Sequence, residues 1–140
     1  MLKEMMPVSI HDVVKEIAAI KIAGYRFITI SCVPVDEAHF DILYHFDREL
    51  ELRHLRLTVT KDIVVPSISS VYFAAFLAEN EVQDLFGIHF DGMAIDYKGT
   101  LFLEKTPHTT PFCKYTVQGS STERGKPRPA SPNSHTREDQ

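Results

Sequence analysis

Three carboxylates lie close together in the stretch ENEVQDLFG, residues 79–87. Glu81 and Asp84 are three residues apart, a spacing that places two side chains on one face of a helix. Such a pair can act as general acid and base, bind a metal ion or meet a basic partner. The stretch falls at the end of a predicted helix, where the dipole disfavours each acid by up to about 1 kcal/mol. The acids therefore require either solvent screening or a positively charged partner.

The residues around the acids leave several interpretations open. Catalysis by Glu81 and Asp84 lacks a nearby nucleophile or oxyanion donor. A metal site would need a histidine at helical spacing, and the nearest one, His89, lies beyond Gly87. A solvated acidic helix end is the simplest alternative. An interface for a basic partner fits best, because large apolar residues lie among the acids.

The helix that positions the acids is predicted from residue 67 or 70 to residue 86, with Pro66 before it and Gly87 as its left-handed stop. One apolar arc is predicted to pack on a sheet, and it comprises Val71, Ala74, Ala75, Ala78, Val82, Leu85 and Phe86. Large apolar residues also occupy other sides, and no Lys or Arg occurs between Lys61 and Lys98. We therefore predict a partner interface, with Phe86 in an apolar pocket of the partner, formed by Phe73, Leu77, Glu79, Glu81, Asp84, Phe86 and Gly87.

The remaining elements predict an α+β fold, with helices packed on one face of a largely antiparallel sheet. A helix is expected over residues 9–24, and strands over 25–35, 40–47 and 50–59, with DREL as a hairpin and a bulge near His54. Short final strands are expected at 88–90 and 101–103. Residues 1–116 form the predicted folded domain. Residues 117–140 are rich in Ser, Pro, Gly and mixed charge, which predicts a disordered tail.

Composition excludes several classes of function. The net charge of −4 and the lack of a basic run argue against nucleic-acid binding. No stretch approaches the roughly twenty apolar residues of a membrane-spanning helix, so we expect a cytosolic chain. Cys32 and Cys113 cannot supply the four ligands of an iron-sulfur cluster, and no nucleotide-binding loop occurs. His45 and His54 flank the hairpin and could meet across strands, where a structural role is favoured over a metal site. We expect no catalytic centre, metal or cofactor on this chain.

The run VPSISSVYFAAFLAENEVQDLFGIHFDG, residues 65–92, resembles the signature region of the C-type, or 30-kDa, peripheral-arm subunit of respiratory complex I. That family has a Val-Pro-Ser start followed by Glu-x-Glu-x-x-Asp-Leu-Phe-Gly-Ile-x-Phe, which matches this chain from Glu79 to Phe90. The resemblance extends over roughly residues 10–105. It implies a subunit without a redox centre of its own that docks on a large catalytic subunit.

Departures from the respiratory pattern point to a related branch. The usual Arg between the glutamates is Asn80, the usual aromatic residue before the Asp is Gln83, and a His-Pro with a basic run is replaced by residues 93–99. This version is similar to its counterpart in energy-converting, membrane-bound nickel-iron hydrogenases of the Ech type, which perform ferredoxin-linked proton reduction. The resemblance implies a peripheral position on the cytoplasmic face of the membrane, with the nickel-iron centre and iron-sulfur clusters on large and small partner subunits. An NADH-quinone oxidoreductase subunit and a free-standing soluble domain with a carboxylate site are the alternatives.

Overall fold

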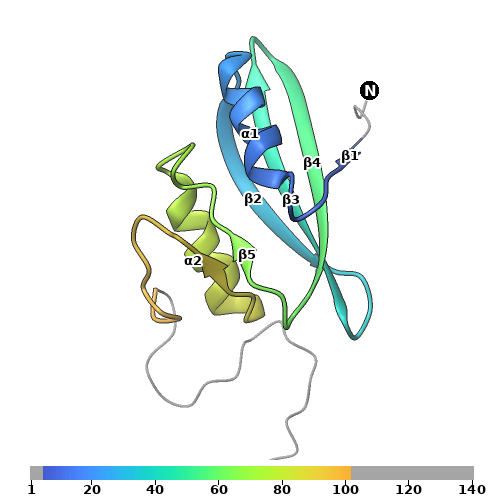
Figure 1. Ribbon diagram of the computed structural model, residues 1–140, viewed down its shortest axis with the longest axis vertical. Helices are drawn as coiled ribbons and strands as arrows, with labels where there is room; N and C mark the ends of the chain where they lie inside the picture. Colours follow the sequence, from blue (N-terminus) through green and yellow to red (C-terminus); the bar gives the residue numbers. More distant parts are fainter. Residues whose placement is uncertain (1–4, 102–140) are drawn as a thin grey trace, which may run out of the picture.

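The computed structural model describes residues 5–101, and its main feature is one four-stranded sheet (Figure 1). Strands β2 (Arg26–Pro34), β3 (His39–Arg48) and β4 (Glu51–Thr60) run antiparallel, and β1 (Met6–Pro7) pairs in parallel with β4. The order across the sheet is β1-β4-β3-β2. The predicted tail at 117–140 and most of the predicted strand at 101–103 lie outside the described residues.

Both helices cover the same face of this sheet. Along β3, Phe40, Ile42, Tyr44 and Phe46 are buried while the residues between them are not, as expected for a strand with one covered face. Helices α1 (Val13–Ile22) and α2 (Ala75–Phe86) contribute their buried residues to the same hydrophobic cluster. In Figure 1, α1 lies over the sheet and α2 lies beside β2. The predicted α+β architecture is confirmed.

The hairpin between β3 and β4 is present, but the predicted bulge is in the wrong strand. The pairing of β3 with β4 has no register shift from the pair His39 and Thr60 to the pair Arg48 and Glu51. The register shift lies instead between Phe27 and Thr29 of β2. The prediction failed because it treats Leu50 as an inward residue of the strand. Leu50 is instead a turn residue with φ 69° and is 97% exposed. The register of β4 therefore needs no correction at His54.

The second helix begins later than predicted. Residues 67–74 form an irregular, turn-rich segment, and regular helix starts at Ala75. A small parallel pair joins β5 (Val65–Pro66) to β6 (Phe90–Asp91), which brackets the helix and partly confirms the strand predicted at 88–90. This pair fixes both ends of the segment that contains the three acids. Within the described residues, neither helix is long and apolar enough to cross a membrane.

Candidate protein interface on the second helix

Glu79 points into the protein and is held there by the segment that precedes the helix. Its side chain has no exposed surface, Ser67 Oγ donates a hydrogen bond to Oε2 at 2.6 Å, and the Ile68 amide donates to Oε1 at 2.7 Å. Burial raises the pKa of Glu79 to about 7, against the lowering effect of these two hydrogen bonds. The expectation that Glu79 lacks a partner in this chain, and meets one on another protein, is therefore wrong for the described structure.

The Glu79 contacts also explain why the helix starts late. Ser67 and Ile68 direct a hydroxyl and an amide to the carboxylate, and the Ser69 amide donates to Ser67 Oγ at 3.1 Å. These contacts hold residues 67–69 against the buried carboxylate in an irregular conformation, and the helix begins further on, at Ala75. Tyr44 is also fully buried nearby, and its hydroxyl has no hydrogen-bond partner among residues 5–101. Burial, followed by the charge of Glu79, raises the pKa of Tyr44.

The other two acids lie in different environments from each other. Asp84 is only 1% exposed, and a Cβ placed on Gly99 would lie 4.0 Å from its Oδ1, so it faces the loop after β6. Glu81 is exposed and makes no hydrogen bond or ion pair with another described residue. Because the Asp84 carboxylate is buried and the Glu81 carboxylate is exposed, the two do not form the surface acid/base pair that their spacing allowed. Of the three predicted acids, only Glu81 is available to a partner.

The predicted apolar residues also divide between the core and the surface. Phe73 is 63% exposed and Leu77 is 49% exposed. Phe86 is half-buried, and its ring packs edge-on against Phe40 of the sheet with centroids 6.3 Å apart. Its predicted insertion into a partner's pocket is replaced by this packing within the chain. Gly87 has φ 71°, which confirms it as the left-handed stop of the helix.

Two residues that the sequence did not single out for the site organise its loop. Asn80 is fully buried, donates from Nδ2 to the carbonyls of Phe76 (2.7 Å) and Ile95 (2.8 Å), and accepts from the Tyr97 amide at 2.8 Å. Gln83 donates to Asp96 Oδ1 at 3.1 Å. These bonds attach residues 95–97 to α2. The only sequence signal for this arrangement was that both positions depart from the respiratory pattern.

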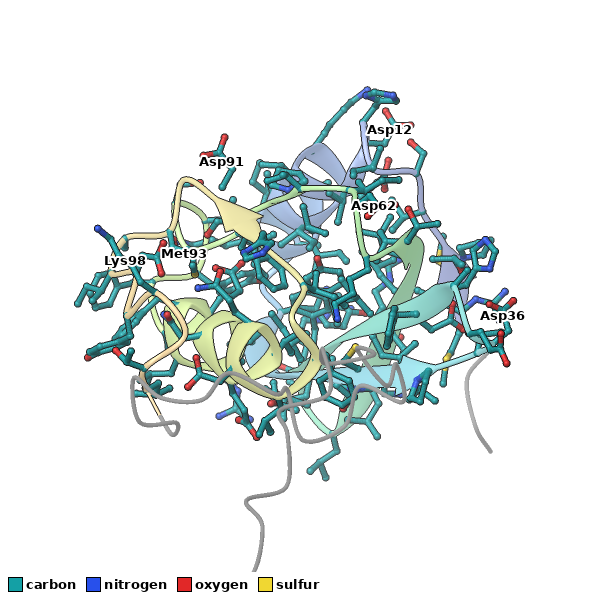
Figure 2. The ribbon with its side chains drawn as sticks, turned by 90° about the horizontal axis from the view of Figure 1, so that it is seen from below. Asp12, Asp36, Asp62, Asp91, Met93 and Lys98 are labelled. Atoms are coloured by element: carbon teal, nitrogen blue, oxygen red, sulfur yellow. The ribbon has the colours of Figure 1, made fainter. Side chains whose placement is uncertain are left out.

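Figure 2 places this loop on one side of the molecule. Met93 and Lys98 lie near α2, and Asp91 lies beyond β6 on the same side of the view, away from Asp12 and Asp36. Ile95 and Tyr97 of the same loop are 41% and 39% exposed. Leu77 and Glu81 are exposed, and their spacing of four residues places them on one side of α2. Phe73, in the turn just before the helix, is exposed as well. Helix and loop together present a mixed apolar and acidic surface.

Comparison with known proteins identifies the family. Residues 4–120 match the family described as respiratory-chain NADH dehydrogenase, 30 Kd subunit. The chain belongs to this family. The predicted resemblance to the complex I 30-kDa subunit is thereby confirmed, whereas the hydrogenase branch stays a prediction.

Curated relatives of this 30-kDa family member are the C subunits of bacterial NADH-quinone oxidoreductases. That of Methylobacterium radiotolerans is 45% identical over 64 residues, covering 42% of this chain and 28% of the relative. That of Ruegeria pomeroyi is 41% identical over 61 residues, covering 42% of this chain and 30% of the relative. The matched segment therefore spans less than a third of either relative.

A solved structure confirms the fold over a longer part of the chain. It belongs to the membrane-bound sulfane sulfur reductase, described as an archaeal respiratory membrane complex. The TM-score is 0.65 at 19% identity, and the match covers 76% of this chain and 68% of the other. At this identity the likeness concerns the fold.

Proposed function

We propose that this chain is a structural subunit, without a redox centre of its own, of a membrane respiratory complex related to NADH-quinone oxidoreductase. Membership of the 30-kDa family and the similarity to C subunits of NADH-quinone oxidoreductases support this assignment. In the proposed role, the chain docks on the large catalytic subunit. The observation that carries the proposal is an exposed apolar and acidic face on a helix whose other sides are buried.

The docking surface consists of Phe73, Leu77, Glu81, Ile95 and Tyr97. Four of these are large apolar residues that are between 39% and 63% exposed. Large exposed apolar residues on a helix and on the loop bonded to it are typical of protein interfaces. Asn80 and Gln83 lie behind it and attach the loop to the helix. A surface fixed in this way loses less conformational entropy on docking.

The charge around this surface indicates the chemistry of the partner. Glu81, Asp91 and Asp96 are exposed, and the sequence from Asp62 to Tyr97 contains no Lys or Arg. An apolar patch edged with Arg or Lys on the large subunit would complement it. Arg is the better complement for Glu81, because its planar guanidinium matches a carboxylate in two hydrogen bonds. The buried acids Glu79 and Asp84 have no such role in the proposal.

The energy-converting nickel-iron hydrogenase branch is the second candidate, and Asn80 favours it. In the respiratory pattern this position is usually Arg, whereas here Asn80 is buried and uses both ends of its amide to hold the loop. A longer, charged residue would not fit these contacts. Under this candidate the partners are a nickel-iron large subunit and an iron-sulfur small subunit, and the chain lies at the cytoplasmic face of the membrane.

Purification of a tagged chain from membranes in mild detergent tests the proposal. The double variant Leu77→Ser/Glu81→Lys removes apolar area and reverses charge at exposed positions, so we expect an unchanged melting temperature and loss of the large subunit. Glu37→Lys, an exposed acid in the β2–β3 loop, is the matched control and should retain it. Retention of the large subunit by the double variant at wild-type level would refute the docking surface.

The proteins recovered with the wild-type chain distinguish the two candidates. Quinone-linked or nucleotide-linked subunits would place the complex in the respiratory branch. A nickel-iron large subunit would place it with the hydrogenases. A chain recovered alone from the soluble fraction would contradict both.

A further inference from the structure

Three side chains form a hydrogen-bonded chain on the face of the sheet opposite the helices. His45 of β3 is directly opposite His54 of β4, and Ser31 of β2 is opposite Leu43, two residues along β3 from His45. Ser31 Oγ lies 3.0 Å from His45 Nε2, and His45 Nδ1 lies 2.8 Å from His54 Nδ1. All three are partly buried. Their neighbours Tyr44 and Leu55 point to the core, so this trio faces away from it.

The two imidazoles face each other through their Nδ1 atoms. Their rings are nearly perpendicular, at 74°, with centroids 5.0 Å apart. A contact between two ring nitrogens at this distance requires one N–H and one lone pair. Ser31 can accept a hydrogen bond from His45 Nε2, which leaves the lone pair of His45 on Nδ1. Metal-binding histidines are usually oriented by an oxygen on their other ring nitrogen in this way.

In place of the structural role, and of the absence of a metal, that the sequence predicts, we propose that His45 and His54 bind one divalent ion of a late first-row transition metal, Cu²⁺ or Ni²⁺, through their Nδ1 atoms. The proton on His54 Nδ1 moves to Nε2 of the same ring, and both rings turn so that the two Nδ1 lone pairs converge on a metal ion beside the line that joins them. With metal-nitrogen bonds of about 2.05 Å, nitrogens at the observed spacing subtend about 86° at the metal. This angle fits neighbouring positions of a square-planar or tetragonal site. A tetrahedral zinc site would need a nitrogen spacing of about 3.3 Å.

The surroundings favour a metal that prefers nitrogen over one that prefers carboxylates. No group of three or more His, Cys, Asp or Glu side chains within residues 5–101 is placed to hold a metal, so water completes the coordination. Asp47 lies two residues from His45 along β3, and Arg56 lies two residues from His54 along β4. Both residues are therefore on the same face of the sheet as the histidines. Asp47 is paired with Arg26 at 2.5 Å. Arg26 neutralises the Asp47 carboxylate, and Arg56 adds a second positive charge nearby. Metal binding therefore depends on the two imidazoles, which excludes Mg²⁺ and Ca²⁺ as preferred ions.

Titration of the 140-residue chain with CuCl₂ in a buffer that does not coordinate copper, followed by calorimetry and electron paramagnetic resonance, tests this site. We expect one tight equivalent whose spectrum shows two imidazole nitrogens in a tetragonal field. His45→Gln and His54→Gln should each weaken binding at least tenfold and leave one imidazole or none in the spectrum. Ser31→Ala should weaken binding by about 10–100-fold, because it removes the oxygen that orients His45.

The control variant is His89→Gln, an exposed histidine in the loop after α2. It should bind Cu²⁺ like the wild type. Thermal unfolding of each variant checks that the fold is kept, as expected at positions outside the core. Unchanged affinity in both His45→Gln and His54→Gln, or an equal loss in His89→Gln, would overturn the assignment.

Discussion

At the scale of single residues, the three carboxylates of α2 have different environments: Glu79 and Asp84 are buried and Glu81 is exposed. Helical spacing places Glu81 and Asp84 three residues apart on one side of the helix. It did not predict that Glu79 turns inward, because its partners, Ser67 and Ile68, lie 12 and 11 residues earlier in an irregular segment. No local pattern encodes such a contact. Each acid therefore has a separate role: Glu79 is structural, Asp84 is buried, and Glu81 faces solvent.

Glu79 predicts a pH dependence of stability. Its pKa in the folded chain is raised to about 7 from an ordinary value of 4.5. The folded state thus keeps a proton at pH values where the unfolded state has lost it. The stabilisation from this group is complete below about pH 4.5 and is lost as the pH rises through about 7, a change of about 1–3 kcal/mol.

Urea unfolding of wild type and Glu79→Gln between about pH 4.5 and 7.5 measures this effect. Gln has the same shape and stays neutral, so its free energy of unfolding should lack the decline that the wild type shows over this range. Glu81→Gln, at an exposed position, should follow the wild type. Parallel curves for wild type and Glu79→Gln would show that the buried carboxyl does not titrate in this range.

At the scale of elements, the strands were predictable and the segments between them were less so. Runs of β-branched and aromatic residues with partial alternation of apolar and polar side chains located β2, β3 and β4 to within a few residues. The alternation is clearest in β3, where every second residue is buried. The start of α2 was not predictable, because Pro66-Ser67 resembles a helix start while the hydroxyl and amides that follow serve Glu79. The loop after β6 had no periodicity at all. Its position depends on the amide of Asn80, a tertiary contact.

Replacement of Asn80 should release that loop. Asn80→Ala leaves the Ile95 carbonyl and the Tyr97 amide without their partner, and we expect a loss of about 1–3 kcal/mol in the free energy of unfolding. Hydrogen exchange should show faster exchange of the Tyr97 amide while the amides of β3 and β4 stay protected until global unfolding. Thr58→Ala, which removes a hydrogen bond to Asp41 on the far face of the sheet, is the control and should leave Tyr97 unaffected. Equal protection of Tyr97 in wild type and Asn80→Ala would show that other contacts hold the loop.

At the scale of the whole molecule, the two faces of the sheet are unequal. One face packs against both helices, and the other carries Ser31, His45 and His54. The helix wheel predicted that the second helix has more large apolar residues than one core face can cover. The structure places Phe76 inside, at 9% exposure, and leaves Phe73 and Leu77 at the surface. Sequence alone could establish this excess but could not say which residues stay uncovered, since that depends on how the loop after β6 folds over α2.

This excess predicts how the chain behaves without a partner. Exposed Phe73 and Leu77 should make the isolated chain self-associate, because contact between copies removes their apolar surface from water. Analytical ultracentrifugation should show a mass average that rises with concentration for the wild type. Phe73→Ser/Leu77→Ser should remain monomeric over the same range. Its unfolding midpoint should be close to that of the wild type, since both side chains are largely exposed.

The salt dependence separates apolar association from charge effects. Self-association through Phe73 and Leu77 should persist or strengthen at high salt, whereas pairing that involves Glu81 should weaken as ionic screening increases. Ile22→Ser, which changes an exposed apolar residue at the end of α1, provides the matched control and should associate like the wild type. A wild-type chain that stays monomeric at every concentration would mean that this surface is too small or too polar to drive association. The docking on a large subunit would then have to rest mainly on the charge of Glu81 and its neighbours.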